Sequence, residues 1–125
     1  MDYDVLMTAN LTRIFGERSA ERRTAAIREI YAEDAILYEP GTSATGQAAI
    51  GEAVATLLAS LPPAFAFTPQ GPAIGHHDVG RLRWTVGPEG GPSAASGTDV
   101  AHFEDGLIKT LYVFLDPSVD PSRSS

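Results

Sequence analysis

The chain has 125 residues, 43% of them hydrophobic, which is enough for one domain with a single core. Its formal net charge of −7 disfavours nucleic acid and anionic membranes as partners, because both attract basic surfaces. The absence of cysteine excludes disulfides and thiolate metal sites. No apolar run is long enough to span a bilayer, and the N-terminal MDYDVLM lacks the basic start of a secretory signal. The sequence therefore predicts a cytoplasmic protein.

Two helices are predicted first. Apolar residues recur at steps of three and four between Tyr3 and Phe15, and Gly16 ends this stripe. Ser19 is a suitable N-cap for a second helix. The inner face of that helix is expected to carry the stem of Arg23 with Ile27, Ile30 and Tyr31.

A strand and a third helix follow. Ala35–Glu39 is predicted to be a strand that stops at Pro40-Gly41, because proline has no N–H to donate to a neighbouring strand. Residues 42–46 are interpreted as a loop. A third helix is predicted over residues 47–61, where the Pro62-Pro63 pair ends it.

The remaining chain is predicted to form antiparallel strands over residues 65–74, 81–86, 95–103 and 107–115. Alternation places Leu82, Trp84 and Val86 on one face of their strand, and Asp105-Gly106 is typical of a hairpin turn. Helices followed by hairpins indicate an α+β domain over residues 1–116, with a flexible C-terminal tail over residues 117–125. A curved sheet around a helix leaves a hollow, which is a common place for small apolar ligands.

Three strings carry a family resemblance: YAEDAILYEP (31–40), TGQAAIGEAV (45–54) and GTDVAHFEDGLI (97–108). In their order and separations they resemble the NTF2-like superfamily and, within it, the SnoaL-like group. The resemblance implies a cone of three N-terminal helices packed on a curved, mostly antiparallel sheet. It also implies an apolar cavity and a homodimer that pairs through the outer side of the sheet. It leaves the activity open, because members include isomerases, cyclases, hydrolases and pure binding proteins.

Glu39-Pro40 matches the place where steroid isomerases of this superfamily carry their catalytic base. A proton-shuttling base needs a pKa above that of free glutamate, and an apolar cone raises it by desolvation. The resemblance also calls for two hydrogen-bond donors to the substrate oxygen, but this chain has Ile14 or Phe15 and Ala101 at those positions. The known ketosteroid isomerase arrangement is therefore not expected.

The epoxide-hydrolase and cyclase patterns of the superfamily are also incomplete. The epoxide hydrolases use a relay of two aspartates and an arginine. At the corresponding positions this chain has Arg83, Thr85 and Val113, so both aspartates are missing. The His and Asp that SnoaL cyclases carry on the last strand are replaced by Leu111 and Val113. The aspartate of the family's G-x-D-V string is kept as Asp99, and the resemblance places it on the cavity face with Ala101 and Phe103.

Two carboxyls are the catalytic candidates, each with a plainer alternative. Glu39 is either a cavity base or the solvated end of a strand. Asp99 is either its partner, or a residue that caps the loop at Gly97-Thr98 or pairs with Arg81 or Arg83. If the two carboxyls lie together, their like charges raise the pKa of one of them.

The ligand-binding candidates are apolar residues expected on the inner face of the domain: Phe15, Leu58, Trp84, Phe103, Leu111, Val113 and Leu115. Sequence alone does not separate lining from core. Tyr38 and His102 are expected on the opposite face of the sheet, where His102 fits an interface. His76-His77-Asp78 is interpreted as a solvated turn, so neither a metal nor a cofactor is expected.

The sequence thus favours a SnoaL-like protein whose cavity binds a small hydrophobic or polycyclic molecule. Cofactor-free acid–base catalysis of the isomerase, cyclase or hydratase type, with Glu39 and Asp99, is the enzyme hypothesis. A non-catalytic ligand-binding or dimeric assembly module is the alternative. Whether the protein is an enzyme stays open at this point.

Overall fold

The computed structural model describes residues 1–117 as three α-helices and a seven-stranded sheet. The elements are α1 (Tyr3–Asn10), the π-helix η1 (Leu11–Phe15), α2 (Ala20–Ile30), β1 (Tyr31–Glu39), β2 (Thr42–Thr45), α3 (Gln47–Ser60), β3 (Phe65–Pro69), β4 (Ile74–His76), β5 (Val79–Pro88), β6 (Ala95–Glu104) and β7 (Leu107–Leu115). The predicted α+β class is confirmed. The third helix, however, follows the first two strands rather than joining the others at the N-terminus.

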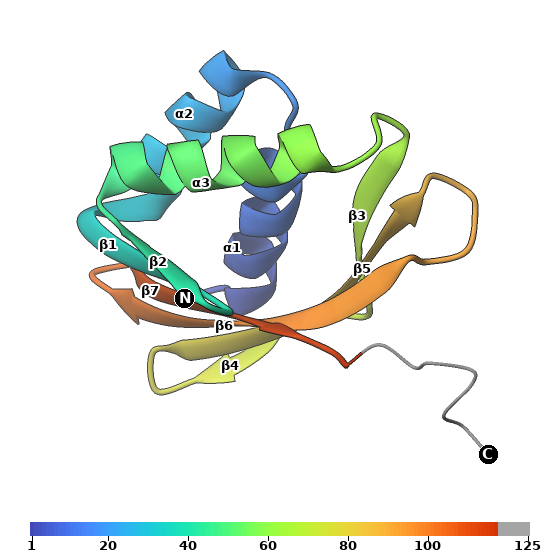
Figure 1. Ribbon diagram of the computed structural model, residues 1–125. Coiled ribbons are helices and arrows are strands. Elements are labelled where there is room, and N and C mark those ends of the chain that lie inside the picture. The colour runs from blue at the N-terminus through green and yellow to red at the C-terminus, as the bar shows by residue number, and fades with distance from the viewer. Residues whose placement is uncertain (118–125) are drawn as a thin grey trace.

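The sheet is mixed and curved. Its strand order is β2-β1-β7-β6-β5-β3, with β4 paired to β5 beside this path. Six strand pairs were found, and only β1 with β7 is parallel within the part of the chain that the structure describes. Figure 1 shows the three helices on the concave side of the sheet, so that the core lies between the two layers.

Several predicted boundaries are wrong for local reasons. Tyr31 was placed on the second helix but begins β1, since α2 ends at Ile30. Residues 42–45 form β2, because Gly41 at φ +81° reverses the chain onto β1. The predicted strand 65–74 is two strands, because Gly71 adopts φ +78° between them. The predicted flexible tail covers residues 117–125. Its residues from 118 on lie outside the described part of the chain.

The first predicted helix changes type halfway along. Asp2 caps α1 by accepting a hydrogen bond from the Val5 N–H at 3.0 Å. The helix then widens into η1, which Gly16 ends. The π-helix carries Leu11, Ile14 and Phe15 into the core, with all three buried. Short π segments are frequent beside functional sites.

One polar pair is buried inside this apolar core. The Tyr31 hydroxyl donates to Asn10 Oδ1 at 2.6 Å, and neither residue has any solvent exposure. Asn10 Nδ2 has no partner among the described residues. This hydrogen bond joins the end of α1 to the start of β1. It also avoids the free-energy cost of leaving the Tyr31 hydroxyl and Asn10 Oδ1 buried without a partner.

We expect Tyr31→Phe to lower the free energy of unfolding by about 1–3 kcal/mol, because it leaves the side-chain oxygen Oδ1 of Asn10 buried without a hydrogen-bond donor. Urea unfolding measures the change. Tyr112→Phe is the matched control, since Tyr112 is 43% exposed, and its effect should be near zero. Equal stability of the two variants would contradict a stabilising role for the buried pair.

Candidate functional site

The site is an apolar cavity of about 210 Å³ between the helical layer and the concave face of the sheet. Its deep part holds buried residues such as Asp99 and Trp84, and its mouth is marked by exposed Pro40, Ala95 and Leu115. The full lining is Leu11, Phe15, Glu39, Pro40, Leu57, Leu61, Phe67, Trp84, Val86, Ala95, Asp99, Val113 and Leu115. Within residues 1–117, Glu39 and Asp99 are the only ionisable residues of this lining.

The strand register places the two carboxyls in one row across the sheet. Tyr38 pairs with Tyr112 in parallel, so Glu39 is level with Val113. Val113 in turn pairs with Asp99 on the antiparallel neighbour. Adjacent strands lie about 4.8 Å apart, so one strand separates the backbones of Glu39 and Asp99 by roughly 10 Å. A ligand lying over Val113 therefore has one carboxyl on each side.

Asp99 is almost fully buried, with 2% of its surface exposed. The pKa of its carboxyl is raised to about 7, mainly by burial and to a smaller extent by the charge of Glu39. A hydrogen bond from Trp84 acts the other way: Nε1 donates to Asp99 Oδ1 at 2.9 Å. Burial outweighs this bond, so Asp99 takes up a proton in the physiological range.

Glu39 occupies a wetter place nearer the mouth. The residue is half-buried, and burial raises the pKa of its carboxyl above the ordinary value. It follows Ala35 and Leu37 on the inward face of β1, while Tyr38 points outward. The pKa of Tyr31 is also raised, first by burial and then by the charges of Asp99 and Glu39. Tyr31 therefore stays neutral and keeps the hydroxyl proton that it donates to Asn10.

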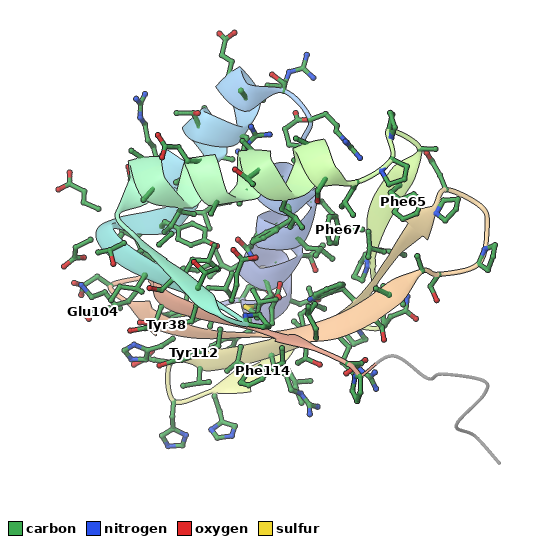
Figure 2. The ribbon with its side chains drawn as sticks, in the orientation of Figure 1. Tyr38, Phe65, Phe67, Glu104, Tyr112 and Phe114 are labelled. Carbon is green, nitrogen blue, oxygen red and sulfur yellow. The ribbon has the colours of Figure 1, made fainter. Side chains whose placement is uncertain are left out.

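Aromatic rings form one wall of the cavity. Phe67 on β3 contacts both neighbours edge to face, with ring centroids 6.2 Å from Phe15 and 5.5 Å from Trp84. Figure 2 shows Phe67 on the helix side of β3. Arg18 fixes the segment above it by donating to the carbonyls of Leu58 and Pro62 at 3.1 and 3.0 Å. This ties the end of α3 to the start of β3 at the cavity.

The predicted ligand residues separate into two groups. Phe15, Trp84, Val113 and Leu115 line the cavity. Leu58, Phe103 and Leu111 were expected there but belong to the packed core. On α3, the cavity side is the face of Leu57 and Leu61, and Leu58 points into the core beside it. Phe103 packs on Tyr3, with ring centroids 5.8 Å apart, at the other end of β6. Leu111 lies beneath the helices with no exposure.

The expected structural partners of Asp99 are replaced by Trp84. Arg81 and Arg83 lie on the exposed face of β5, opposite the buried carboxyl, and Arg83 pairs with Asp116 at 3.2 Å. His102 is exposed and faces away from Asp99, as alternation predicts. His77 and Asp78 form an exposed turn with positive φ. Within residues 1–117, no three acidic, histidine or cysteine side chains gather as a metal site.

Comparison with known proteins places this geometry in a family. The three helices on one side of a curved sheet define a small α+β domain with an apolar cavity. A model of the SnoaL-like domain matches residues 11–111, and the chain belongs to this family. A search of the curated proteins found no match. None of the helices among the described residues is long and apolar enough to cross a membrane.

Solved structures share the fold. An Agrobacterium tumefaciens protein of the SnoaL-like family, provisionally named an isomerase, has a TM-score of 0.84 at 25% identity, over 92% of this chain and 97% of that one. A Kribbella flavida protein provisionally named a ketosteroid isomerase has a TM-score of 0.72 at 16% identity, over 95% and 81%. A Sinorhizobium meliloti protein provisionally named a polyketide cyclase has a TM-score of 0.69 at 16% identity, over 87% and 93%.

Stability should decrease between about pH 4 and pH 7 because of Asp99. Its pKa is about 7 in the fold against an ordinary 3.8, so the folded state keeps a proton that the unfolded state releases. The stabilisation is complete below about pH 4 and is lost as the pH rises through 7, with a slope of roughly 1 kcal/mol per pH unit. Urea unfolding between pH 4.5 and 7.5 measures it.

Asp99→Asn should flatten this slope, leaving the smaller contribution that Glu39 makes in the same direction. The exposed pairs of Asp34 with Lys109 and Glu29 with Arg13 lower those carboxyl pKa values and act at more acidic pH. An unchanged slope in the Asp99→Asn protein would show that Asp99 titrates normally.

Proposed function

We propose that the cavity binds a small apolar molecule and moves protons on it without a cofactor, with Glu39 as the base and Asp99 as the acid. The observation that carries the proposal is the row of two carboxyls on the wall of an otherwise apolar cavity. Environments that separate the pKa values of two such groups assign their roles. Asp99 is the more deeply buried and keeps its proton, whereas the half-buried Glu39 ionises first.

The size of the cavity limits the ligand. At about 210 Å³ it is smaller than the roughly 300 Å³ at which drug-sized pockets begin. A molecule of one or two rings suits this volume better than a larger polycycle. The aromatic wall of Phe15, Phe67 and Trp84 favours a flat molecule, because aromatic groups stack or meet edge to face.

The chemistry follows from where the two groups lie. Glu39 removes a proton from a carbon held over Val113. The negative charge that develops on a ligand oxygen or nitrogen then meets the Asp99 carboxyl on the other side, which donates a hydrogen bond or its proton. The apolar surroundings strengthen both interactions, since little water competes with them.

Glu39→Gln should lower the turnover of a proton-abstraction probe by about 100-fold or more. A suitable probe is 5-nitrobenzisoxazole: a base removes its C3 proton, the N–O bond breaks to leave a nitrile, and the phenolate oxygen that forms accepts a hydrogen bond from an acid. Absorbance of the product measures the rate. In the wild-type protein the rate should rise as Glu39 ionises and fall as Asp99 loses its proton near pH 7.

Glu33→Gln is the matched control, because Glu33 is an exposed glutamate on the same strand. It should keep the wild-type rate. Equal rates in the Glu39→Gln and Glu33→Gln proteins would overturn the role of Glu39 as base and favour a binding protein without catalysis.

We also propose that the protein forms a homodimer through the outer face of the sheet, which would serve either a catalyst or an assembly module. Tyr38 stacks on Tyr112, with ring centroids 5.0 Å apart, although each ring is about 40% exposed. Register continues this row through Val100 to Arg81. Figure 2 shows Tyr38, Tyr112 and Phe114 on the side of the sheet away from the helices. Tyrosine, phenylalanine and arginine are enriched in protein interfaces.

Tyr112→Lys should convert the dimer to a monomer, because it places a charge in the centre of this face, in the same row as Arg81. Light scattering after size exclusion measures the mass. Val5→Lys, at an exposed apolar position on α1, is the control and should keep the dimer. A wild-type monomer, or a dimer that withstands Tyr112→Lys, would contradict the proposed interface.

A further inference from the structure

Trp84 and Gly97 face each other across the β5–β6 pair. A Cβ atom at Gly97 would lie 2.5 Å from Cζ2 and 2.8 Å from Cη2 of the indole, and 2.5 Å from the backbone oxygen of Phe114. No side chain fits at such distances. The missing side chain of Gly97 is therefore what lets the indole lie directly against β6.

The other end of the indole reaches Asp99. Asp99 follows Gly97 by two residues, so it shares the inward face of β6. The Trp84 Nε1–H donates to Asp99 Oδ1 at 2.9 Å, with both residues at most 5% exposed. Phe67 contacts the indole edge to face, with ring centroids 5.5 Å apart. The ring is thus held by Gly97, Phe67 and the carboxyl it contacts.

We propose that Trp84 is a positioning residue for the acid Asp99, and that Gly97 provides the space in which the indole holds one carboxyl oxygen and leaves the other free for the ligand. The oxygen that accepts the indole N–H is the carbonyl-like one, so the acidic proton sits on Oδ2. The catalytic consequence rests on the proposed function. The orientation and ionisation of Asp99 do not, because they exist without a ligand.

The groups around Asp99 make this bond measurable. Glu39 and Tyr31 on β1 are the titratable side chains whose charges interact with Asp99, and the described part of the cavity lining holds no lysine, arginine or histidine. The indole N–H favours the ionised carboxylate and so lowers the pKa of Asp99, against the larger effect of burial. Removing the N–H while keeping a ring should therefore raise that pKa.

The test is a titration of Trp84→Phe with ¹³C-labelled aspartate carboxyls, followed by NMR. The midpoint of Asp99 should move up by about one pH unit from its wild-type value, the size expected for one hydrogen bond to a charged group. Phe103→Leu is the control: it removes a buried aromatic ring that packs on Tyr3 at the other end of β6, and it should leave the midpoint unchanged. An unchanged midpoint in folded Trp84→Phe would overturn the proposal.

A second measurement uses the protein without altering Trp84. Trp84 is the only tryptophan of the chain, so the intrinsic fluorescence reports on this ring alone. Its emission should titrate with a midpoint near 7 as a charge forms beside the indole, and Asp99→Asn should abolish the change. Emission that is independent of pH in the wild-type protein would overturn the bond. A shifted carboxyl midpoint without turnover of 5-nitrobenzisoxazole would keep the positioning role and overturn the catalytic function.

Discussion

The burial of Asp99 without a cation is the constraint on which the site depends. A carboxylate in an apolar environment is costly, and proteins meet that cost with a partner charge, with hydrogen bonds or with a bound proton. Here the hydrogen-bond partner is a single indole N–H, and the charge of Glu39 increases the cost of ionising Asp99. Asp99 therefore holds its proton up to about pH 7. A group that is neutral there can donate to a ligand, which an ordinary aspartate cannot do.

The sheet topology is what turns this property into a site. The one parallel pair, β1 with β7, brings Glu39 level with Val113, and the antiparallel β6 brings Asp99 to the other side of the same residue. Both carboxyls line the cavity, and Figure 1 shows α3 lying across the concave side of the sheet. The π-helix and the Arg18 contacts complete the cavity by placing Leu11, Phe15 and the end of α3 over it. Segments distant in sequence thus meet at one small volume.

Periodicity predicted which side chains share a face of each strand, and the family resemblance identified the inner face of the strand with Asp99. Alternation correctly put Asp99 and Trp84 on the inner face and Tyr38 and His102 on the outer one. The bond between Trp84 and Asp99 was missed, because it depends on the register between two strands, which no local pattern specifies. The same holds for the row of Glu39, Val113 and Asp99. The sequence did contain one signal for this bond. A glycine and an aspartate stand two residues apart on one strand, and the neighbouring strand has a tryptophan on its inward face.

Other parts of the fold and lining depend on features that residue patterns do not contain. The stripe from Tyr3 to Phe15 fits an α-helix as well as an α-helix followed by a π turn. The choice between Leu57 and Leu58 as lining depends on the rotation of α3 over the sheet. Side-chain packing decides both the helix type and the rotation of α3. The predicted set of cavity residues therefore also contained core residues, namely Leu58, Phe103 and Leu111.

The most direct test of this account is the ¹³C NMR titration of the Asp99 carboxyl in the unaltered protein. A midpoint near 7 would show a buried acid that is still about half protonated at neutral pH, as its burial predicts. A midpoint near 4, the ordinary value of an aspartate in water, would mean that the cavity is wet around Asp99 and that the chain has no acid there to offer.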